Sequence, residues 1–138
     1  MLSDIQCGNN FVMVLTKDGK LYEWVNTSQP KLHTDLPDDI KIIQIGAGLG
    51  HSAALTSCGV LFCWGTNKFG QVGNGSFESQ GEPQKVLPLS GIPNETKVIA
   101  CACGPRSTFA VTEDGNVRML EFVAVPTHNN SLWVMKLD

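Results

Sequence analysis

At 138 residues, the chain is long enough for one domain with a modest hydrophobic core. Its formal net charge of −3 and the lack of a basic cluster argue against direct binding to nucleic acid, which requires cations that neutralise phosphates. No apolar stretch approaches the roughly 20 residues of a membrane-spanning helix, and five cysteines without a C-x-x-C pair argue against a disulfide framework or a zinc site.

The chain contains three segments that align with one another without gaps, at residues 2–24, 42–64 and 98–120. Each begins with an apolar run, continues with a small residue and a glycine, and then has a second apolar run that ends in threonine. A turn and a third run follow. Repetition of this kind indicates one supersecondary unit used several times. Helical periodicity is absent over any useful length, so the sequence predicts an all-β protein.

The turns between the second and third runs favour β-hairpins. They read Asp18-Gly19, Cys58-Gly59 and Asp114-Gly115, and glycine accepts the positive φ that such turns require. The strands that they join are short and apolar on both faces, which is typical of sheets packed face to face. We therefore expect small antiparallel sheets that stack on one another.

The middle segment continues into a glycine-rich stretch that the other two lack. The chain advances nineteen positions from Trp64 to Pro83 but only six from Trp24 to Pro30, and the third segment is shortened in the same way. The stretch reads W-G-T-N-K-F-G-Q-V-G-N-G, and its density of glycine predicts a compact, hydrogen-bonded turn system. The residues that define it are Trp64, Gly65, Asn67, Gly70, Gln71, Gly73 and Gly75.

This stretch resembles the signature of the regulator of chromosome condensation repeat, W-G-x-N-x-x-G-Q-[LV]-G-x-G, in which each repeat builds one blade of a β-propeller. The resemblance extends over most of residues 2–126, although the outer two segments match it in their strands and not in the signature turn. It implies an all-β fold made of propeller blades, with seven blades in the full family fold. We assign the three repeats to residues 1–40, 41–96 and 97–138.

Three repeats cannot close a ring, because propellers have roughly 4–8 blades. Residues 131–137 resemble the opening strand of a fourth repeat, and Met1 lies almost on the first strand of the first. A partial propeller leaves sheet edges and apolar blade faces exposed, which favours self-association. We expect the chain to be a fragment or a short isoform, rather than one that completes its ring with other copies.

Candidate catalytic groups do not converge in the repeat pattern. The three histidines, His33, His51 and His128, fall at unrelated repeat positions, and His51 is expected to form a hydrogen bond within its own blade. No metal-ligand set, Ser/His/Asp arrangement or cofactor motif emerges. The sequence therefore predicts no catalytic residues, no metal and no cofactor, and we expect the chain not to be an enzyme.

The cysteines favour a reducing compartment, the cytoplasm or the nucleus. Cys7 and Cys103 occupy the repeat position of Ala47, so we expect them to be small buried strand residues, with Cys101 packed beside Cys103. Cys58 replaces the aspartate of a hairpin turn and is expected to be exposed.

Surfaces remain as candidate sites. In a propeller, loops at equivalent repeat positions gather on one face around the axis, so the loops after the first strand of each repeat are the predicted partner-binding residues: Asn9, Asn10, Leu49, Gly50, Pro105 and Arg106. Arg106 is the predicted anchor, because arginine is enriched at binding hot spots. Phe69, in the glycine-rich stretch, is interpreted as a blade-packing residue rather than a contact.

Two functions fit these features. The resemblance implies a non-catalytic interaction or scaffolding segment of a regulatory protein, with protein partners, no direct nucleic-acid contact and no membrane span. The alternative is a guanine-nucleotide exchange factor for a small GTPase, which would use an inserted hairpin to open the nucleotide site. The one long connection, Phe77 to Val86, is polar and is short compared with such an inserted hairpin, which favours the first function.

Overall fold

The structure is a computed structural model that describes residues 1–26, 29–34, 36, 39–86, 96–120 and 133–136. Its strands form three four-stranded antiparallel sheets, called blades 1, 2 and 3 below. Blade 1 comprises β1 (Leu2–Cys7), β2 (Phe11–Thr16), β3 (Leu21–Val25) and β4 (Lys31–Leu32). Blade 2 comprises β5 (Ile42–Ala47), β6 (His51–Thr56), β7 (Leu61–Gly65) and β8 (Gln80–Lys85). Blade 3 comprises β9 (Val98–Cys103), β10 (Thr108–Thr112), β11 (Asn116–Leu120) and β12 (Trp133–Lys136). The predicted all-β fold of propeller blades is confirmed.

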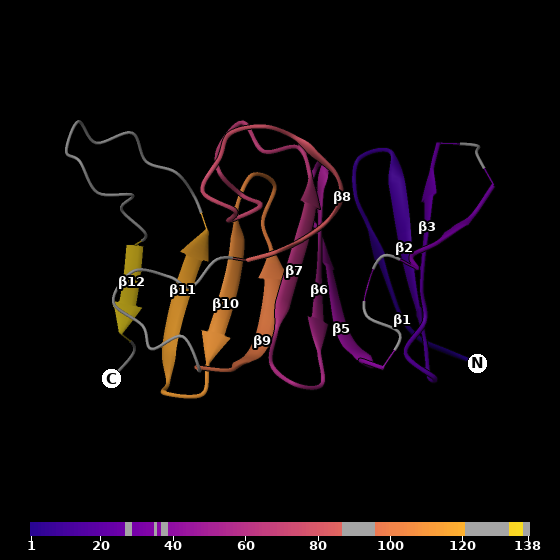
Figure 1. Ribbon diagram of the computed structural model, residues 1–138. Helices are drawn as coiled ribbons and strands as arrows, with labels where there is room; N and C mark the ends of the chain where they lie inside the picture. Colours follow the sequence, from indigo (N-terminus) through magenta and orange to yellow (C-terminus); the bar gives the residue numbers. More distant parts are fainter. Residues whose placement is uncertain (27–28, 35, 37–38, 87–95, 121–132, 137–138) are drawn as a thin grey trace.

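The three blades stand side by side in chain order (Figure 1). Each is a meander in which strands adjacent in sequence pair with one another, and the first strands β1, β5 and β9 lie next to each other across the blades. The connections after the first strand of each blade, and the glycine-rich stretch after β7, lie at one end of the molecule, called the upper end below, as in Figure 1. The hairpin turns between second and third strands lie at the opposite, lower end.

The first strand of every blade carries an irregularity at the same repeat position. The pairing with the second strand skips one residue, namely Ser3 in β1, Ile43 in β5 and Ile99 in β9. A residue inserted in this way is left outside the ladder and turns its side chain away from the regular alternation. This explains why Ile43 and Ile99 are 50% and 57% exposed although they lie within apolar strands.

The hairpin turns at the lower end depend on glycine, as predicted. Gly19, Gly59 and Gly115 have φ values of 86°, 83° and 82°, which residues with a side chain rarely adopt. Gly59 also lies beside the first strand of the next blade. The Val98 N–H donates to the Gly59 carbonyl at 2.9 Å. The turns at Gly19 and Gly59 therefore both reverse the chain and lie against the start of the following blade.

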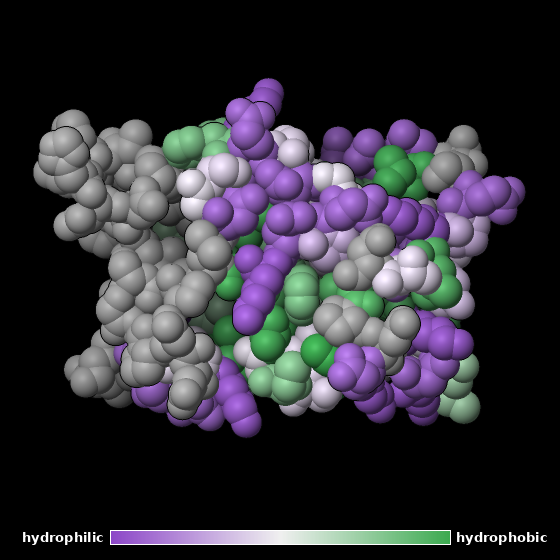
Figure 2. All heavy atoms as spheres, viewed as in Figure 1, coloured by the Kyte–Doolittle hydropathy of each residue, from purple (hydrophilic) through white to green (hydrophobic). Residues whose placement is uncertain are grey.

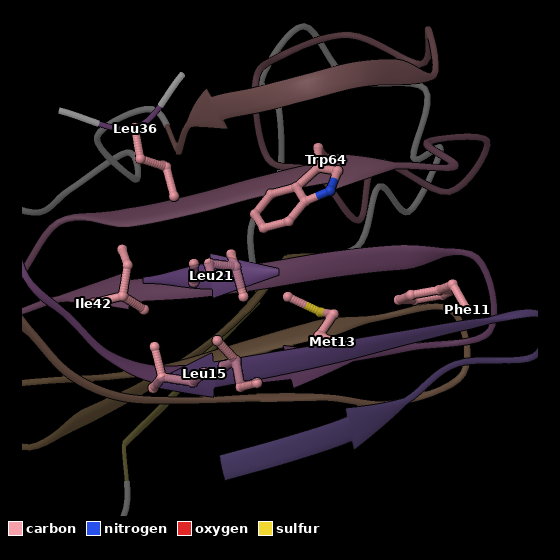
Figure 3. Packing of buried hydrophobic residues seen from close by; sticks show 9 residues of the cluster. Phe11, Met13, Leu15, Leu21, Leu36, Ile42 and Trp64 are labelled. Atoms are coloured by element: carbon pink, nitrogen blue, oxygen red, sulfur yellow. The ribbon is translucent and has the colours of Figure 1, made fainter. Parts of the chain in front are cut away.

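Blades 1 and 2 pack through a continuous apolar cluster (Figure 3). Met13, Leu15 and Leu21 of blade 1 point toward Ile42 and Trp64 of blade 2, and all of them are nearly inaccessible to solvent. The full set of buried members is Phe11, Met13, Leu15, Leu21, Leu36, Ile42, Ile45, Ala54 and Trp64. This cluster fixes the position of the loops at the upper end of the first two blades.

A second apolar cluster joins blades 2 and 3. Its buried members are Ala53, Leu55, Leu61, Cys63, Val72, Cys101, Ala110 and Leu120. Strand β6 contributes to both clusters, since Ala54 faces blade 1 whereas Ala53 and Leu55 face blade 3. All six residues of β6 are buried, which accounts for the apolar character of both of its faces in the sequence.

The outward face of blade 1 is uncovered. Ile5 is 58% exposed, whereas the residues at the same repeat position, Ile45 and Cys101, are 3% and 6% exposed because each packs on the preceding blade. The expectation that Cys7 is buried was wrong for the same reason, since this residue is exposed on the face that no preceding blade covers. Cys101 is buried with Cys103 packed beside it, and Cys58 is exposed, as predicted, whereas Cys103 is partly buried and not fully buried as expected.

The last strand corrects a second expectation. Residues 131–137 were interpreted as the start of a fourth repeat, but β12 pairs antiparallel with β11, with Asn116 opposite Lys136 and Met119 opposite Trp133. It is therefore the fourth strand of blade 3, in the place that β4 and β8 occupy in the other blades. The pattern of three aligned runs per repeat omitted this outer strand, because its sequence differs from blade to blade.

Candidate partner-binding loops

The loops that follow the first strands form one continuous row at the upper end. The Asn9 N–H donates to the Leu49 carbonyl at 3.0 Å, and the Leu49 N–H donates to the Pro105 carbonyl at 3.1 Å. These backbone bonds link blade 1 to blade 2 and blade 2 to blade 3. We call residues 8–10, 48–50 and 104–106 the loop row. The structure thus brings all six sequence-predicted partner-binding residues into one place.

Glycine gives each of these loops its tight form. A Cβ atom added to Gly8 would lie 1.9 Å from the Phe11 ring, and one added to Gly48 would lie 2.1 Å from the His51 ring. The side chain that follows the loop therefore folds back over the glycine, and any larger residue there would displace it. This packing explains the small residue and glycine found at the end of each first strand.

His51 forms its side-chain hydrogen bond to the neighbouring blade and not within its own blade. The sequence predicted a hydrogen bond within its own blade, but His51 Nε2 lies 3.2 Å from the carbonyl oxygen of Ser107 in blade 3. The side chain is fully buried, and burial lowers its pKa. A histidine that stays neutral at this place supports the loop row and is not available to solvent as an acid or base.

The exposed members of the loop row differ in chemistry. Asn9, Asn10, Leu49, Pro105 and Arg106 are exposed, and Gly50 is half-buried. Figure 2 shows hydrophilic side chains gathered along the upper end, with apolar side chains visible among them. A mixed surface of this kind, on loops held rigidly by backbone bonds, suits recognition of another protein.

Arg106 does not stand alone. Its guanidinium carbon lies 5.0 Å from the centre of the Phe69 ring, so the glycine-rich stretch of blade 2 contacts the loop of blade 3. Phe69 is 37% exposed and therefore belongs to the surface, whereas the sequence suggested a packing residue. The contact orients the guanidinium group and leaves it accessible at the end of the loop row.

The glycine-rich turn, residues 65–79, is organised around one buried side chain. Asn67 Nδ2 donates to the carbonyl oxygens of Ser76 at 2.8 Å and Glu78 at 3.0 Å, and Asn67 Oδ1 accepts from the Val72 N–H at 3.0 Å. Four glycines provide the left-handed backbone that this path requires, with φ values of 100°, 75°, 70° and 78° at Gly65, Gly70, Gly73 and Gly75. The turn covers the upper end of the interface between blades 2 and 3.

A buried carboxylate between blades 1 and 2 was not anticipated from the sequence. Glu23 Oε2 lies 2.9 Å from His33 Nε2 and accepts from Trp64 Nε1 at 3.3 Å, while Glu23 Oε1 accepts from Ser52 Oγ at 3.0 Å. Burial alone would raise the pKa of Glu23, but the hydrogen bonds and the charge interaction with His33 outweigh it, so the pKa is lowered. The sequence contained one indication of this buried carboxylate. Glu23 occupies a repeat position that holds Cys63 and Met119 in the other blades.

The thiols of Cys63, Cys101 and Cys103 are shielded between blades 2 and 3. Burial raises the pKa of Cys101 to about 11 and that of Cys103 to about 12, and it also raises the pKa of Cys63 well above its usual value. A thiol that stays protonated is a poor nucleophile and a poor metal ligand. Within the described residues, no three His, Cys, Asp or Glu side chains are grouped so that they could hold a metal ion. No helix in this part of the chain is long and apolar enough to cross a membrane.

Comparison with known proteins places these features in context. Two models of the regulator of chromosome condensation (RCC1) repeat match the chain, one at residues 59–111 and the other at residues 42–71. The chain is 38% identical over 128 residues to the ultraviolet-B receptor UVR8 of Arabidopsis thaliana, a match that covers 84% of this chain and 28% of the receptor. It is 34% identical over 128 residues to the E3 ubiquitin-protein ligase HERC2 of Homo sapiens, which covers 82% of this chain and 2% of the ligase.

A solved structure is similar in both fold and sequence. Prp20p of Saccharomyces cerevisiae superposes with a TM-score of 0.71 and 26% identity, covering 88% of this chain and 33% of Prp20p. That protein was described together with its binding properties to Gsp1p and histones. The chain spans about a third or less of the length of each of these relatives.

Proposed function

Because the chain belongs to the regulator of chromosome condensation repeat family, we propose that it is a non-catalytic segment that binds another protein through the loop row. The observation that carries the proposal is the pair of backbone hydrogen bonds that join the loops of the three blades, Asn9 to Leu49 and Leu49 to Pro105. Loops joined in this way present one rigid surface, which reduces the entropy lost when a partner binds.

The nature of the surface supports an acidic partner segment. Arg106 lies at the end of the loop row with its guanidinium group oriented by Phe69. An arginine held in this manner can donate two parallel hydrogen bonds to a carboxylate, an arrangement that lysine cannot reproduce. Relatives support a protein as the partner, since Prp20p was described with binding to Gsp1p and histones. We propose the cytoplasm or the nucleus as the site of action.

Replacing Arg106 with alanine is expected to weaken binding of an acidic partner segment by about tenfold or more, as is usual for a hot-spot arginine. The melting temperature should change little, because an exposed cation–π contact contributes only about 0.5–1 kcal/mol. Binding can be measured by quantitative pull-down of a captured partner, with Arg106→Lys included to test the need for two parallel hydrogen bonds.

Lys85 and Lys97 provide matched controls, since both are exposed cations near the lower end of the blades. Lys85→Ala and Lys97→Ala should keep the partners that Arg106→Ala loses. If the partners are lost with the lysine variants and kept with Arg106→Ala, the loop row is the wrong face.

The exchange-factor alternative makes a separate prediction. The segment from Phe77 to Val86, the longest connection in the repeat pattern, is largely taken up by β8, which pairs with β7. It is therefore engaged in the blade and not available as an inserted hairpin. We expect the chain to leave the release of a fluorescent guanine nucleotide from a panel of small GTPases at the spontaneous rate. Clear acceleration with any member of the panel would favour exchange activity over scaffolding.

A further inference from the structure

The two interfaces between blades differ at the upper end. Between blades 2 and 3 the glycine-rich turn closes the interface, since Val72 is completely buried in the apolar cluster and the Gln71 carbonyl accepts from Thr108 Oγ1 at 2.8 Å. Blade 1 has no such turn, because its chain advances only six positions between Trp24 and Pro30. The interface between blades 1 and 2 is therefore built without a cover of this kind.

A pocket of about 390 Å³ lies at that uncovered place. Its walls include Glu23, Ser52 and Trp64. The residues at the same repeat positions in the second interface are those that the glycine-rich turn covers, namely Cys63, Thr108 and Leu120. The pocket thus corresponds to the volume that a part of the chain fills between blades 2 and 3, and its size lies in the range of small-ligand sites.

The charge of the pocket is negative. Among the described residues that line it, Glu23 is the one that carries a charge, and its side chain is 13% exposed. Glu23 Oε1 accepts one hydrogen bond, from Ser52, whereas Oε2 lies within hydrogen-bond distance of both His33 and Trp64. A carboxylate oxygen has two acceptor positions, so Oε1 retains one for a further donor.

His33 contacts Oε2, the other oxygen of the carboxylate. Its Nδ1 atom is buried without a hydrogen-bond partner, and the side chain is inaccessible to solvent. With the proton on Nε2, which faces Glu23, Nδ1 carries only an unused lone pair, whereas a protonated ring would bury an unpaired N–H donor. The geometry therefore places a donor N–H of His33 against Glu23 Oε2.

We propose that this pocket binds a single cationic side chain, a lysine or an arginine, from a partner polypeptide. The charged head would donate to Glu23 Oε1, and its aliphatic stem would lie against Phe11 and Trp64. The hydroxyl and amide groups of Thr66 and Gln80 at the walls provide polar partners for the remaining donors. The pocket adjoins the loop row, since Asn10 and Gly50 also line it, but Arg106 is not among its walls and the proposal does not depend on Arg106.

The test uses N-acetyl-arginine methylamide as the probe and its neutral analogue, N-acetyl-citrulline methylamide, as the comparison. The indole N–H signal of Trp64, assigned with Trp64→Phe, is followed by NMR during titration of the folded chain. We expect a saturable shift with the arginine probe and none with the citrulline analogue. Glu23→Gln should weaken binding of the arginine probe by about tenfold or more, and Glu78→Gln, an equal charge change on an exposed residue nearby, should not.

A steric variant keeps the test valid if Glu23→Gln fails to fold. Gly81 lines the pocket, and a Cβ atom added there would meet no heavy atom within 4 Å, so Gly81→Leu fills space without a clash. It should abolish the shift while the chain remains folded. Arg106→Ala should leave the shift intact, which separates this site from the Arg106 end of the loop row. Equal shifts with both probes, no shift with either, or full retention in Gly81→Leu would overturn the proposal.

Discussion

Gly73→Val is expected to destabilise the chain by about 3 kcal/mol or more, a large part of the roughly 5–15 kcal/mol that stabilises a typical domain. Gly73 has a φ of 70°, and a β-branched residue held in that conformation costs about 1–3 kcal/mol. The added Cβ would also lie 2.9 Å from Leu120 Cδ1 and 3.1 Å from Val86 Cγ1, so the second apolar cluster would have to shift. Urea denaturation followed by tryptophan fluorescence measures the loss.

Gly70→Val should also destabilise the chain, since Gly70 has a φ of 75° and a β-branched residue held in that conformation costs about 1–3 kcal/mol. Lys68→Ala is the control within the same turn, because Lys68 is exposed and fills a variable position of the motif. We expect its stability to lie within about 0.5 kcal/mol of the parent chain. Valine variants that unfold within about 1 kcal/mol of the parent would contradict the role assigned to the turn.

Asn67→Ala is expected to lower the free energy of unfolding by about 3 kcal/mol through lost hydrogen bonds. The substitution leaves the Val72 N–H and the carbonyl oxygens of Ser76 and Glu78 without their partner. Each buried polar group left unpaired costs about 1–3 kcal/mol, and Asn67 is completely buried. The same denaturation experiment applies, and loss of the slow amide exchange of Val72 would locate the damage in the turn.

Asn67→Asp distinguishes hydrogen bonding from packing, because the two side chains have nearly the same shape. Aspartate can still accept from the Val72 N–H, but it places an oxygen where the amide nitrogen faced two carbonyl groups. At neutral pH it should destabilise the chain at least as much as alanine does. A stable Asn67→Asp variant beside an unstable Asn67→Ala variant would mean that packing, not donation by the amide, matters at this position.

Much of the fold could be predicted because tight turns need glycine at particular positions, and these glycines can be recognised in the sequence. The hairpin glycines and the glycine-rich turn need a positive φ, and the blades follow from them. The outer strands could not be predicted in the same way, since β4 has two residues and β8 is polar and contains Pro83. A strand at the edge of a sheet tolerates such residues because one of its sides forms no ladder.

The candidate site was likewise predictable in part. Repeat alignment was enough to group the residues of the loop row, because equivalent positions in stacked blades become neighbours. The contact between Phe69 and Arg106 joins different positions of two repeats, so alignment could not reveal it. Glu23 was missed because its partners lie on three other strands or loops, His33, Ser52 and Trp64, and the carboxylate stands at a position that is apolar elsewhere.

The uncovered faces at the two ends of the row have a consequence for how stability is distributed. An open row has one interface fewer than it has blades, so the three blades of this chain share two apolar clusters. Among the described residues, blade 2 alone packs on a blade at each side. In stacked repeats the free energy of folding is close to a sum of unit and nearest-neighbour contributions. Each blade added to an open stack of blades adds one more interface between blades. Closing the stack into a ring adds one interface without adding a blade. Cohesion should therefore be greatest around β6 and should decline toward both ends of the chain.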